Sequence, residues 1–243
     1  MNKKLILPII LLVVCIGGIV YAAMGIVKET SEIKKAETVS SVFSEFSPSE
    51  ALFCDETESG AALLSVLDSF RPKLEAMQAQ NSDIIGWIYI PQTHIDYPLL
   101  QGSDNKFYLT HGADKRKSAA GCVFVDKNGF AENTIIYGHN MGRSSNVIFH
   151  DITNFSDKAW FEKAKYGYIV TSNNVIRIDF FAYALTKPET QFYSSVPDLE
   201  YIKNNSMHYR DIYSGGDVIT LSTCAYDYKN ARALLIGEAT VLE

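Results

Sequence analysis

Cysteine is scarce in this chain of 243 residues, and the few cysteines are scattered. The four are Cys15, Cys54, Cys122 and Cys224, without a C-x-x-C pair or any spacing typical of a zinc site. Because Cys15 lies in an apolar N-terminal run, three remain outside it, which excludes a disulfide framework and leaves a single Cys54–Cys122 bridge open. No metal-ligating or acidic side chains cluster near the motifs described below, so the sequence predicts neither a metal nor another cofactor.

Positive charge is also in short supply. The chain has 22 Lys and Arg against 28 Asp and Glu, a net charge of −6, and no basic patch interleaved with aromatic residues. This pattern excludes a nucleic-acid-binding surface, so no nucleic-acid partner is expected. Internal repeats, low-complexity blocks and a βαβ rhythm are absent as well. The hydrophobic content of 47%, with 14 Tyr and 13 Phe, is enough for the core of one domain of about 200 residues.

The longest uncharged stretch covers residues 5–27 and follows Lys3 and Lys4. As a helix it would be about 34 Å long, enough to cross a hydrocarbon core of about 30 Å. The preceding lysines predict a cytoplasmic N-terminus and an extracellular remainder, with residues 1–27 as a cytoplasmic stub and single-pass anchor in the cell membrane. A cleaved signal peptide, with Val20-Tyr21-Ala22 as its cleavage site, is the alternative.

Residues 28–59 are polar and carry mixed charges. We interpret them as a flexible linker that spans about 30 Å and tethers a folded domain, residues 60–243, to the membrane. A helical continuation of the apolar stretch to about Val42 is the alternative. Within the domain, apolar residues between positions 61 and 80 recur at helical spacing, and Pro72 is expected to divide this helix in two or to kink it.

From Gly86 onward, β-branched and aromatic residues dominate in short runs separated by turn residues. The predicted strands are residues 86–90, 95–100, 121–126, 133–139, 166–171, 175–185, 218–224 and 232–242. The predicted helices between them are residues 146–152, 157–165 and 197 to about 207. Many short strands with few helices indicate a mainly β domain, namely a closed or nearly closed β-barrel.

Two candidate catalytic residues lie at the ends of neighbouring predicted strands. The run V-I-T-L-S-T-C ends at Cys224, and Arg232 opens the next apolar run after a short turn. In an antiparallel hairpin the last residue of one strand and the first of the next lie about 5 Å apart. A thiol beside a guanidinium is what a nucleophilic cysteine needs, because the cation favours the thiolate and can hold a developing oxyanion.

The base that such a nucleophile requires is expected at His139. The run N-T-I-I-Y-G-H-N-M at 133–141 is another β-like segment that leads to Gly-His, and none of the other histidines ends a run of this kind. We therefore predict Cys224 as nucleophile, His139 as general acid/base and Arg232 as oxyanion or substrate holder. Arg143 is a second candidate for the arginine.

Three upstream segments belong with these motifs: G-W-I-Y-I at 86–90, I-D-Y-P-L-L-Q-G at 95–102 and N-K-F-Y-L at 105–109. Together with T-L-S-T-C, its arginine eight positions on, and I-I-Y-G-H-N-M, they resemble a class B sortase, from about residue 83 to the C-terminus. The resemblance implies a sortase-type β-barrel with N-terminal helices and a helix-bearing insertion before the strand of Cys224.

The resemblance also implies an activity, that of a membrane-anchored cysteine transpeptidase of Gram-positive bacteria. Such an enzyme cleaves a C-terminal sorting motif of secreted proteins after Thr, through a thioacyl-enzyme. It then transfers the acyl group to an amine of the peptidoglycan cross-bridge, or to an amine of another protein subunit as the alternative, and hydrolysis is the expected side activity when no amine is present.

A substrate groove is implied by the same resemblance. Its expected members are Asn105, Leu109, Ser222, Thr186, Phe192 and Tyr193. Ser222 alternates with Cys224 and is therefore expected on the same face of the strand. We interpret Asp227 as a turn residue, with a role in orienting the site as the alternative. Cys122 is expected in the core, with a redox partnership to Cys224 as the alternative.

Other classes of protein fit parts of this pattern. A secreted cysteine protease would use the same residues with water as the acceptor. A non-enzymatic tethered β-module, such as an adhesin or a haem-binding wall protein, would have no selectively reactive thiol. An L,D-transpeptidase is more distant, because its S-x-G-C pattern is absent.

Overall fold

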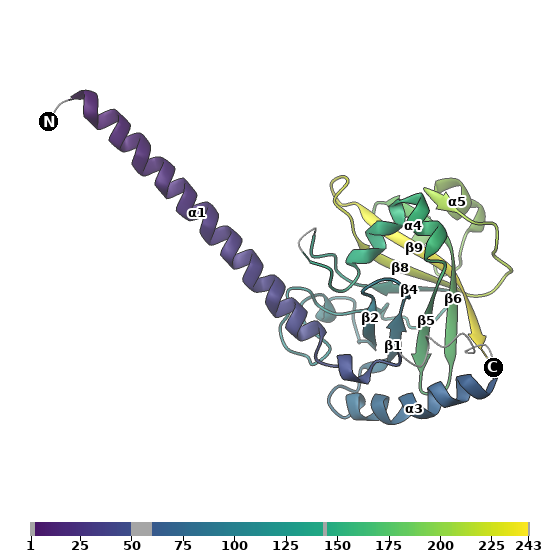
Figure 1. The fold of residues 1–243 in the computed structure, drawn as a ribbon. Coiled ribbons are helices and arrows are strands. Elements are labelled where there is room, and N and C mark those ends of the chain that lie inside the picture. The colour runs from purple at the N-terminus through teal and green to yellow at the C-terminus, as the bar shows by residue number, and fades with distance from the viewer. Residues whose placement is uncertain (1–2, 50–59, 143–144, 243) are drawn as a thin grey trace.

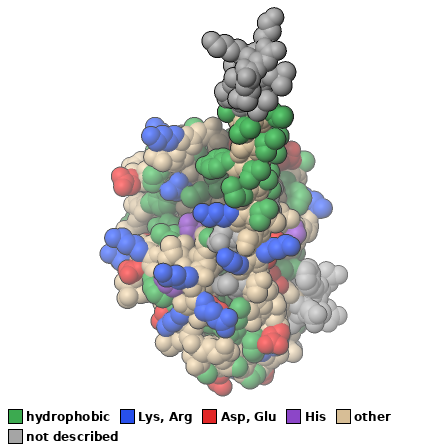
Figure 2. Space-filling view, turned by 90° about the vertical axis from the view of Figure 1, so that its left-hand side faces the viewer, with side chains coloured by type: hydrophobic (Ala, Val, Ile, Leu, Met, Phe, Trp, Pro, Cys, Tyr) green, Lys and Arg blue, Asp and Glu red, His purple; other side chains and the backbone are tan. Residues whose placement is uncertain are grey.

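The computed structural model describes residues 3–49, 60–142 and 145–242. A long helix, α1 (Lys3–Ser40), projects from a β-rich body (Figure 1). Its segment Leu11–Lys35 is long and apolar enough to cross a membrane, and the side chains of residues 11–28 are exposed. Hydrophobic side chains gather on the coloured part of the projection, and several Lys and Arg side chains lie below them on the same face (Figure 2).

The helix α1 does not stop where the apolar residues end. It continues through residues 28–40, so the flexible linker predicted there is wrong and the alternative of a helical continuation holds. These residues include no Gly or Pro, and their Glu, Lys and Ala have high helix propensity, so nothing in them stops the helix. Residues 50–59, with Cys54, lie outside the described residues.

The helix α3 (Gly60–Gln78) lies against the barrel and contacts β1 and β5 (Figure 1). It continues through Pro72, so the expected division into two helices does not occur. Pro72 cannot donate to the carbonyl four residues earlier. The buried Phe70 and Leu74 flank it and hold both halves of the helix to the domain, which offsets the loss of that one hydrogen bond.

Eight strands close into a barrel, which confirms the predicted fold class. Their order around the barrel is β5-β1-β2-β3-β4-β8-β9-β6, and pairing of β6 with β5 completes the circuit. The strands are β1 (Ile84–Tyr89), β2 (Asp96–Gln101), β3 (Phe124–Val125), β4 (Asn133–Tyr137), β5 (Tyr166–Thr171), β6 (Val175–Thr186), β8 (Val218–Cys224) and β9 (Arg232–Leu242). A further short strand, β7 (His208–Tyr209), pairs with β6.

Alternate residues of each strand face opposite sides of the barrel wall. Ile88 belongs to the interior cluster together with Leu221, whereas Trp87 and Tyr89 belong to a second cluster that includes Phe70 of α3. The barrel therefore has an apolar interior and a second core between its outer face and α3. The short helix η1 (Ser44–Phe46) lies next to this second core.

The connections between the strands carry further short helices. These are η2 (Phe107–Leu109), η3 (His150–Ser156), α4 (Lys158–Lys163), η4 (Gln191–Tyr193) and α5 (Leu199–Asn205). The side chains of Asp157 and Asp198 cap α4 and α5 by accepting hydrogen bonds from the first-turn N–H groups of Trp160 and Tyr201, both at 2.9 Å. The segment between β6 and β8, with η4, α5 and β7, is the helix-bearing insertion expected before the strand of Cys224.

One predicted helix is displaced along the chain. Helix was expected at residues 146–152, but it begins at His150. Ile148 has a φ of 58°, in the left-handed region, which a right-handed helix cannot include. The strand predicted at 121–126 is likewise shortened to Phe124–Val125, and Gly121 before it has a φ of +59°.

Candidate active site

The ends of β4, β8 and β9 bring the three predicted catalytic residues together. Cys224 pairs with Arg232 in the antiparallel β8–β9 ladder. Tyr137 and Ser222 are the last pair of the parallel β4–β8 ladder, and His139 and Cys224 each follow two residues beyond it. Because residues paired across strands point to the same face of a sheet, these side chains leave one face at one edge.

That face is the outside of the barrel. Ile219 and Leu221 point into the interior cluster, so by alternation Ser222 and Cys224 point away from it. A cavity of about 430 Å³ lies over this outer face. Its lining residues are Asn105, Leu109, Phe124, Tyr137, Gly138, His139, Pro188, Glu189, Tyr193, Ser222, Thr223, Cys224 and Arg232.

The ring of His139 is held by the segment that follows β2. Its Nε2 lies 2.8 Å from the carbonyl oxygen of Leu109. Because a carbonyl oxygen can only accept a hydrogen bond, Nε2 carries a proton. Nδ1 is therefore the ring nitrogen left to exchange a proton with another group.

Backbone hydrogen bonds fix the segment that carries His139. The N–H of Gly138 donates to the carbonyl of Ser222 at 3.2 Å, and the N–H of Phe149 donates to the carbonyl of His139 at 3.0 Å. A Cβ at position 138 would lie 2.7 Å from the ring of Phe149. Glycine before His139 therefore lets this ring pack directly against the backbone of the segment.

Cys224 and Arg232 are each half-buried. Nη1 of Arg232 donates to the carbonyl of Ala231 at 3.0 Å, which fixes one side of the guanidinium. No ion pair engages Arg232 among the residues that the structure describes. Its charge and its remaining N–H groups are therefore available to a ligand in the cavity.

Four of the predicted substrate residues line the cavity: Asn105, Leu109, Ser222 and Tyr193. Nδ2 of Asn105 donates to the carboxylate of Asp126 at 2.6 Å, and its Oδ1 accepts from the N–H of Lys127 at 2.8 Å. The hydroxyls of Tyr193 and Ser222 are 2.9 Å apart and share a hydrogen bond.

The other two predicted substrate residues do not line the cavity. Thr186 lies opposite Arg232 in the β6–β9 ladder and is buried. Phe192 is 2% exposed and packs in a cluster that includes Ile202 of α5. Both therefore lie behind the cavity wall rather than in it.

The cavity also includes residues that were not predicted, chiefly Tyr137, Phe124, Pro188 and Glu189. The sequence offered a signal for Tyr137, because it precedes His139 by two positions and so shares its face of the strand. Burial raises the pKa of Tyr137, and the neighbouring Asp126 adds to the effect, so the phenol remains a hydrogen-bond donor. Pro188 and Glu189 lie in an irregular loop, for which periodicity gives no signal.

Two of the remaining candidates, Asp227 and Cys122, do not line this cavity. Asp227 is exposed in the loop after β8. Cys122 is unbonded and 6% exposed, and burial raises the pKa of its thiol well above the ordinary value, so it is a neutral core residue. Arg143 lies outside the described residues. Across residues 3–49, 60–142 and 145–242, no three His, Cys, Asp or Glu side chains gather closely enough to hold a metal ion.

Known proteins share this arrangement of strands and motifs. A family model described as the sortase domain matches residues 88–240. Sortase B of Listeria monocytogenes is 35% identical over 196 residues, which cover 73% of this chain and 78% of that protein. A class B sortase of Streptococcus pyogenes involved in pilus biogenesis is 29% identical with a TM-score of 0.63, covering 68% of this chain and 97% of that one. A Staphylococcus aureus sortase B–substrate complex, at 24% identity, has the same fold with a TM-score of 0.64, over 71% of this chain and 87% of that one.

Proposed function

The chain belongs to the sortase family, as a class B member, and on this basis we propose that Cys224, His139 and Arg232 are its catalytic residues. The observation that carries the proposal is their convergence, from three strand ends, on one cavity over the outer face of the barrel. Each has a distinct role in the transfer of an acyl group from a sorting motif to an amine.

Cys224 is the nucleophile. Its thiolate attacks the carbonyl carbon of the Thr in the sorting motif, and the carbonyl oxygen becomes a negatively charged oxyanion. When this intermediate collapses, the C–N bond breaks, the following residue leaves as an amine, and the acyl group remains on Cys224 as a thioester. Arg232, opposite Cys224 in the ladder, donates hydrogen bonds to the oxyanion and favours the thiolate by its charge.

His139 moves the protons. Its Nε2 is occupied by the carbonyl of Leu109, so Nδ1 is the atom that gives a proton to the departing amine. The same nitrogen then takes a proton from the incoming amine as that amine attacks the thioester. The cross-bridge amine of peptidoglycan is the proposed acceptor, which anchors the secreted protein to the cell wall.

The sorting motif binds in the cavity, between the segment after β2 and the loop after β6. Asn105 has a second N–H beyond the one that Asp126 accepts; no group in the described part of the chain accepts it, so it can bind a peptide carbonyl. The apolar side chain of Leu109 and the hydrogen-bonded pair of Tyr193 and Ser222 complete the lining. Phe192 and Thr186 do not contact the motif; their side chains pack behind the cavity lining and hold it in place.

The helix α1 is the proposed membrane anchor, with a cytoplasmic N-terminus and an extracellular catalytic domain at residues 60–243. Its exposed apolar side chains have no counterpart to pack against in the described part of the domain. Removal of residues 1–27 is therefore expected to yield a soluble, active enzyme. An aggregated product would instead make the span part of the fold.

The decisive experiment incubates the full chain in detergent micelles with a library of sorting peptides, with and without triglycine as the amine. We expect a thioester on Cys224 by intact mass, and a peptide–triglycine product. Cys224→Ala is expected to abolish the thioester and the product while the protein stays folded. Cys122→Ala removes a thiol in the core and is the control, which is expected to retain the thioester and the product.

The alternatives predict different results in the same experiment. Turnover by Cys224→Ala would place the nucleophile elsewhere. Hydrolysis at a rate that ignores triglycine would identify a cysteine protease with water as the acceptor. A peptide electrophile that fails to label Cys224 selectively would favour a binding module without activity.

A further inference from the structure

Asn140, the residue after His139, lies between the two segments that carry the reacting groups. Its side chain is 5% exposed. Its Nδ2 donates to the carbonyl of Cys224 at 3.0 Å, and its Oδ1 accepts from the N–H of Gly142 at 2.9 Å. Because a carbonyl can only accept and a backbone N–H can only donate, these two bonds determine which end of the amide faces Cys224.

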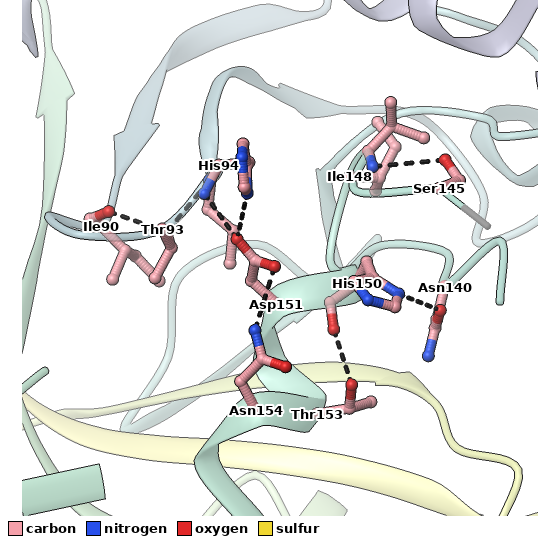
Figure 3. Close-up of polar contacts among 12 residues, drawn as sticks. Ile90, Thr93, His94, Asn140, Ser145, Ile148, His150, Asp151, Thr153 and Asn154 are labelled. Atoms are coloured by element: carbon pink, nitrogen blue, oxygen red, sulfur yellow. Dashed lines mark hydrogen bonds and ion pairs between the residues drawn. The ribbon is translucent and has the colours of Figure 1, made fainter. Parts of the chain in front are cut away.

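His150, at the start of η3, holds the other end of this amide. Its ring points toward Asn140, and its Nδ1 lies 3.0 Å from the Oδ1 of Asn140 (Figure 3). Since Oδ1 is an acceptor, Nδ1 of His150 must carry a proton, which holds for one neutral tautomer and for the cation. The neighbouring Phe149 donates its N–H to the carbonyl of His139. The start of η3 therefore holds both His139 and Asn140.

Tyr226 provides a second link in the opposite direction. Its hydroxyl donates to the carbonyl of Asn140 at 2.7 Å. The segment of His139 thus gives a side-chain hydrogen bond to the backbone of Cys224, and the loop after Cys224 gives one back. Two bonds that run in opposite directions prevent the two segments from sliding or separating.

These bonds are needed because the β ladder ends just before the site. The last paired residues of β4 and β8 are Tyr137 and Ser222, and one further bond joins Gly138 to Ser222. Beyond this point no regular ladder holds His139 level with Cys224. The hydrogen bond from the amide of Asn140 to the carbonyl of Cys224 joins the two segments beyond the end of the ladder.

We propose that Asn140 is a positioning residue that sets the separation between the thiol of Cys224 and the ring of His139. The inference rests on the proposed roles of these two residues. Attack and proton transfer require reacting atoms within about 3.5 Å, and a misplacement of about 1 Å can cost about 100-fold in rate. Asn140 acts from behind, because it lines a separate cavity of about 260 Å³ and not the one that contains Cys224.

Asn140→Asp tests this with the smallest change of shape. Aspartate keeps both acceptors for Gly142 and His150 but has no N–H to give to the carbonyl of Cys224. We expect kcat of the full chain in micelles, with sorting peptide and triglycine, to fall at least tenfold while KM stays within threefold. Asn81→Asp is the matched control, since Asn81 is 1% exposed and its Nδ2 donates to the carbonyl of Ala113 at 2.8 Å and to the hydroxyl of Tyr108 at 3.0 Å, and not to Cys224.

The control is expected to keep kcat within threefold. A kcat for folded Asn140→Asp within twofold of the wild type overturns the inference. An equal fall of kcat in Asn81→Asp, or a rise in the KM of Asn140→Asp with unchanged kcat, also overturns it. If Asn140→Asp fails to fold, Tyr226→Phe decides, because Tyr226 is 68% exposed and the variant loses one hydroxyl. We expect its kcat to fall at least threefold, and an unchanged kcat overturns the inference. A wild-type chain without turnover, or an active Cys224→Ala, refutes the proposed function instead.

Discussion

Replacing Arg232 by lysine keeps a positive charge beside Cys224 but removes the planar fork of N–H groups. In the structure one of these groups is already used, since Nη1 donates to the carbonyl of Ala231. The guanidinium can hold that bond and still present its other N–H groups to an oxyanion. A lysine ammonium is a single nitrogen on a flexible stem and cannot make both contacts in a fixed geometry.

The size of the effect follows from what the lost donors do. Removing one donor to an oxyanion typically lowers kcat by about 100-fold to 1,000-fold, equivalent to about 2.7–4 kcal/mol of transition-state stabilisation. Because lysine retains the charge, we expect the lower end of this range, a loss of about 100-fold. The free energy of unfolding should change by less than about 1 kcal/mol, because Arg232 is half-buried at a strand end.

The assay measures kcat and KM with a sorting peptide and an amine, together with the thermal unfolding midpoint. Arg71→Lys is the matched control, since Arg71 lies on α3 and its guanidinium pairs with Asp68 at 2.6 Å, away from the cavity. We expect this control to keep wild-type kcat. A kcat for Arg232→Lys within threefold of the wild type would refute the role in the oxyanion, and a raised KM with unchanged kcat would assign Arg232 to substrate binding.

Three further substitutions test other parts of the structure. Gly138→Ala places a Cβ 2.7 Å from the ring of Phe149, so we expect the free energy of unfolding, measured with denaturant, to fall by about 1–3 kcal/mol and kcat to fall as well. Wild-type values for both would mean that the ring of Phe149 moves aside without cost. Burial alone would raise the pKa of Glu238, but hydrogen bonds, first among them that from the N–H of Gly216, lower it. The charged carboxylate of Glu238 therefore stabilises the fold at pH values above the ordinary Glu pKa of about 4.3, and this stabilisation is lost as the pH falls below that value. Glu238→Gln should therefore flatten the acid side of a plot of Tm against pH. Wild-type and variant plots that run parallel would contradict this. Leu221→Ala removes a fully buried side chain of the barrel interior and should cost about 2–5 kcal/mol of stability with normal kcat for the folded fraction; a specific loss of kcat would contradict the separation of the two faces.

Local signals were enough to delimit three strands, whereas the strand predicted at 133–139 ends at Tyr137, before His139. The bounds predicted for β5, β8 and β9 match the structure, because each is a β-branched or apolar run between clear turn residues. The pairing of Cys224 with Arg232 followed from the short loop between two such strands. Alternation likewise placed Ser222 on the face of Cys224, where it lines the cavity.

The sequence was less informative wherever the backbone leaves regular structure. The positive φ of Ile148 delays η3 until His150, and a β-branched residue gives no warning of this conformation. In the short turn η4, Tyr193 lines the cavity while its neighbour Phe192 is buried against α5, and no period distinguishes the two. The hydrogen bonds of Asn140 were equally hidden, since they depend on a contact across 84 residues of sequence.

The location of the cavity explains why the sequence indicates candidate catalytic groups more clearly than the residues that would set specificity. The barrel interior is filled by apolar side chains such as Ile88 and Leu221, so it has no room for a peptide, and the substrate must bind outside. On the outer face, strand pairing fixes Cys224 and Arg232, two of the groups proposed for the chemistry, and strand pairing is readable from sequence. The walls come instead from η2 and from the loop of Pro188 and Glu189, which no ladder constrains. We therefore expect residues in these walls, rather than the strand ends, to decide which sorting motif the proposed site accepts.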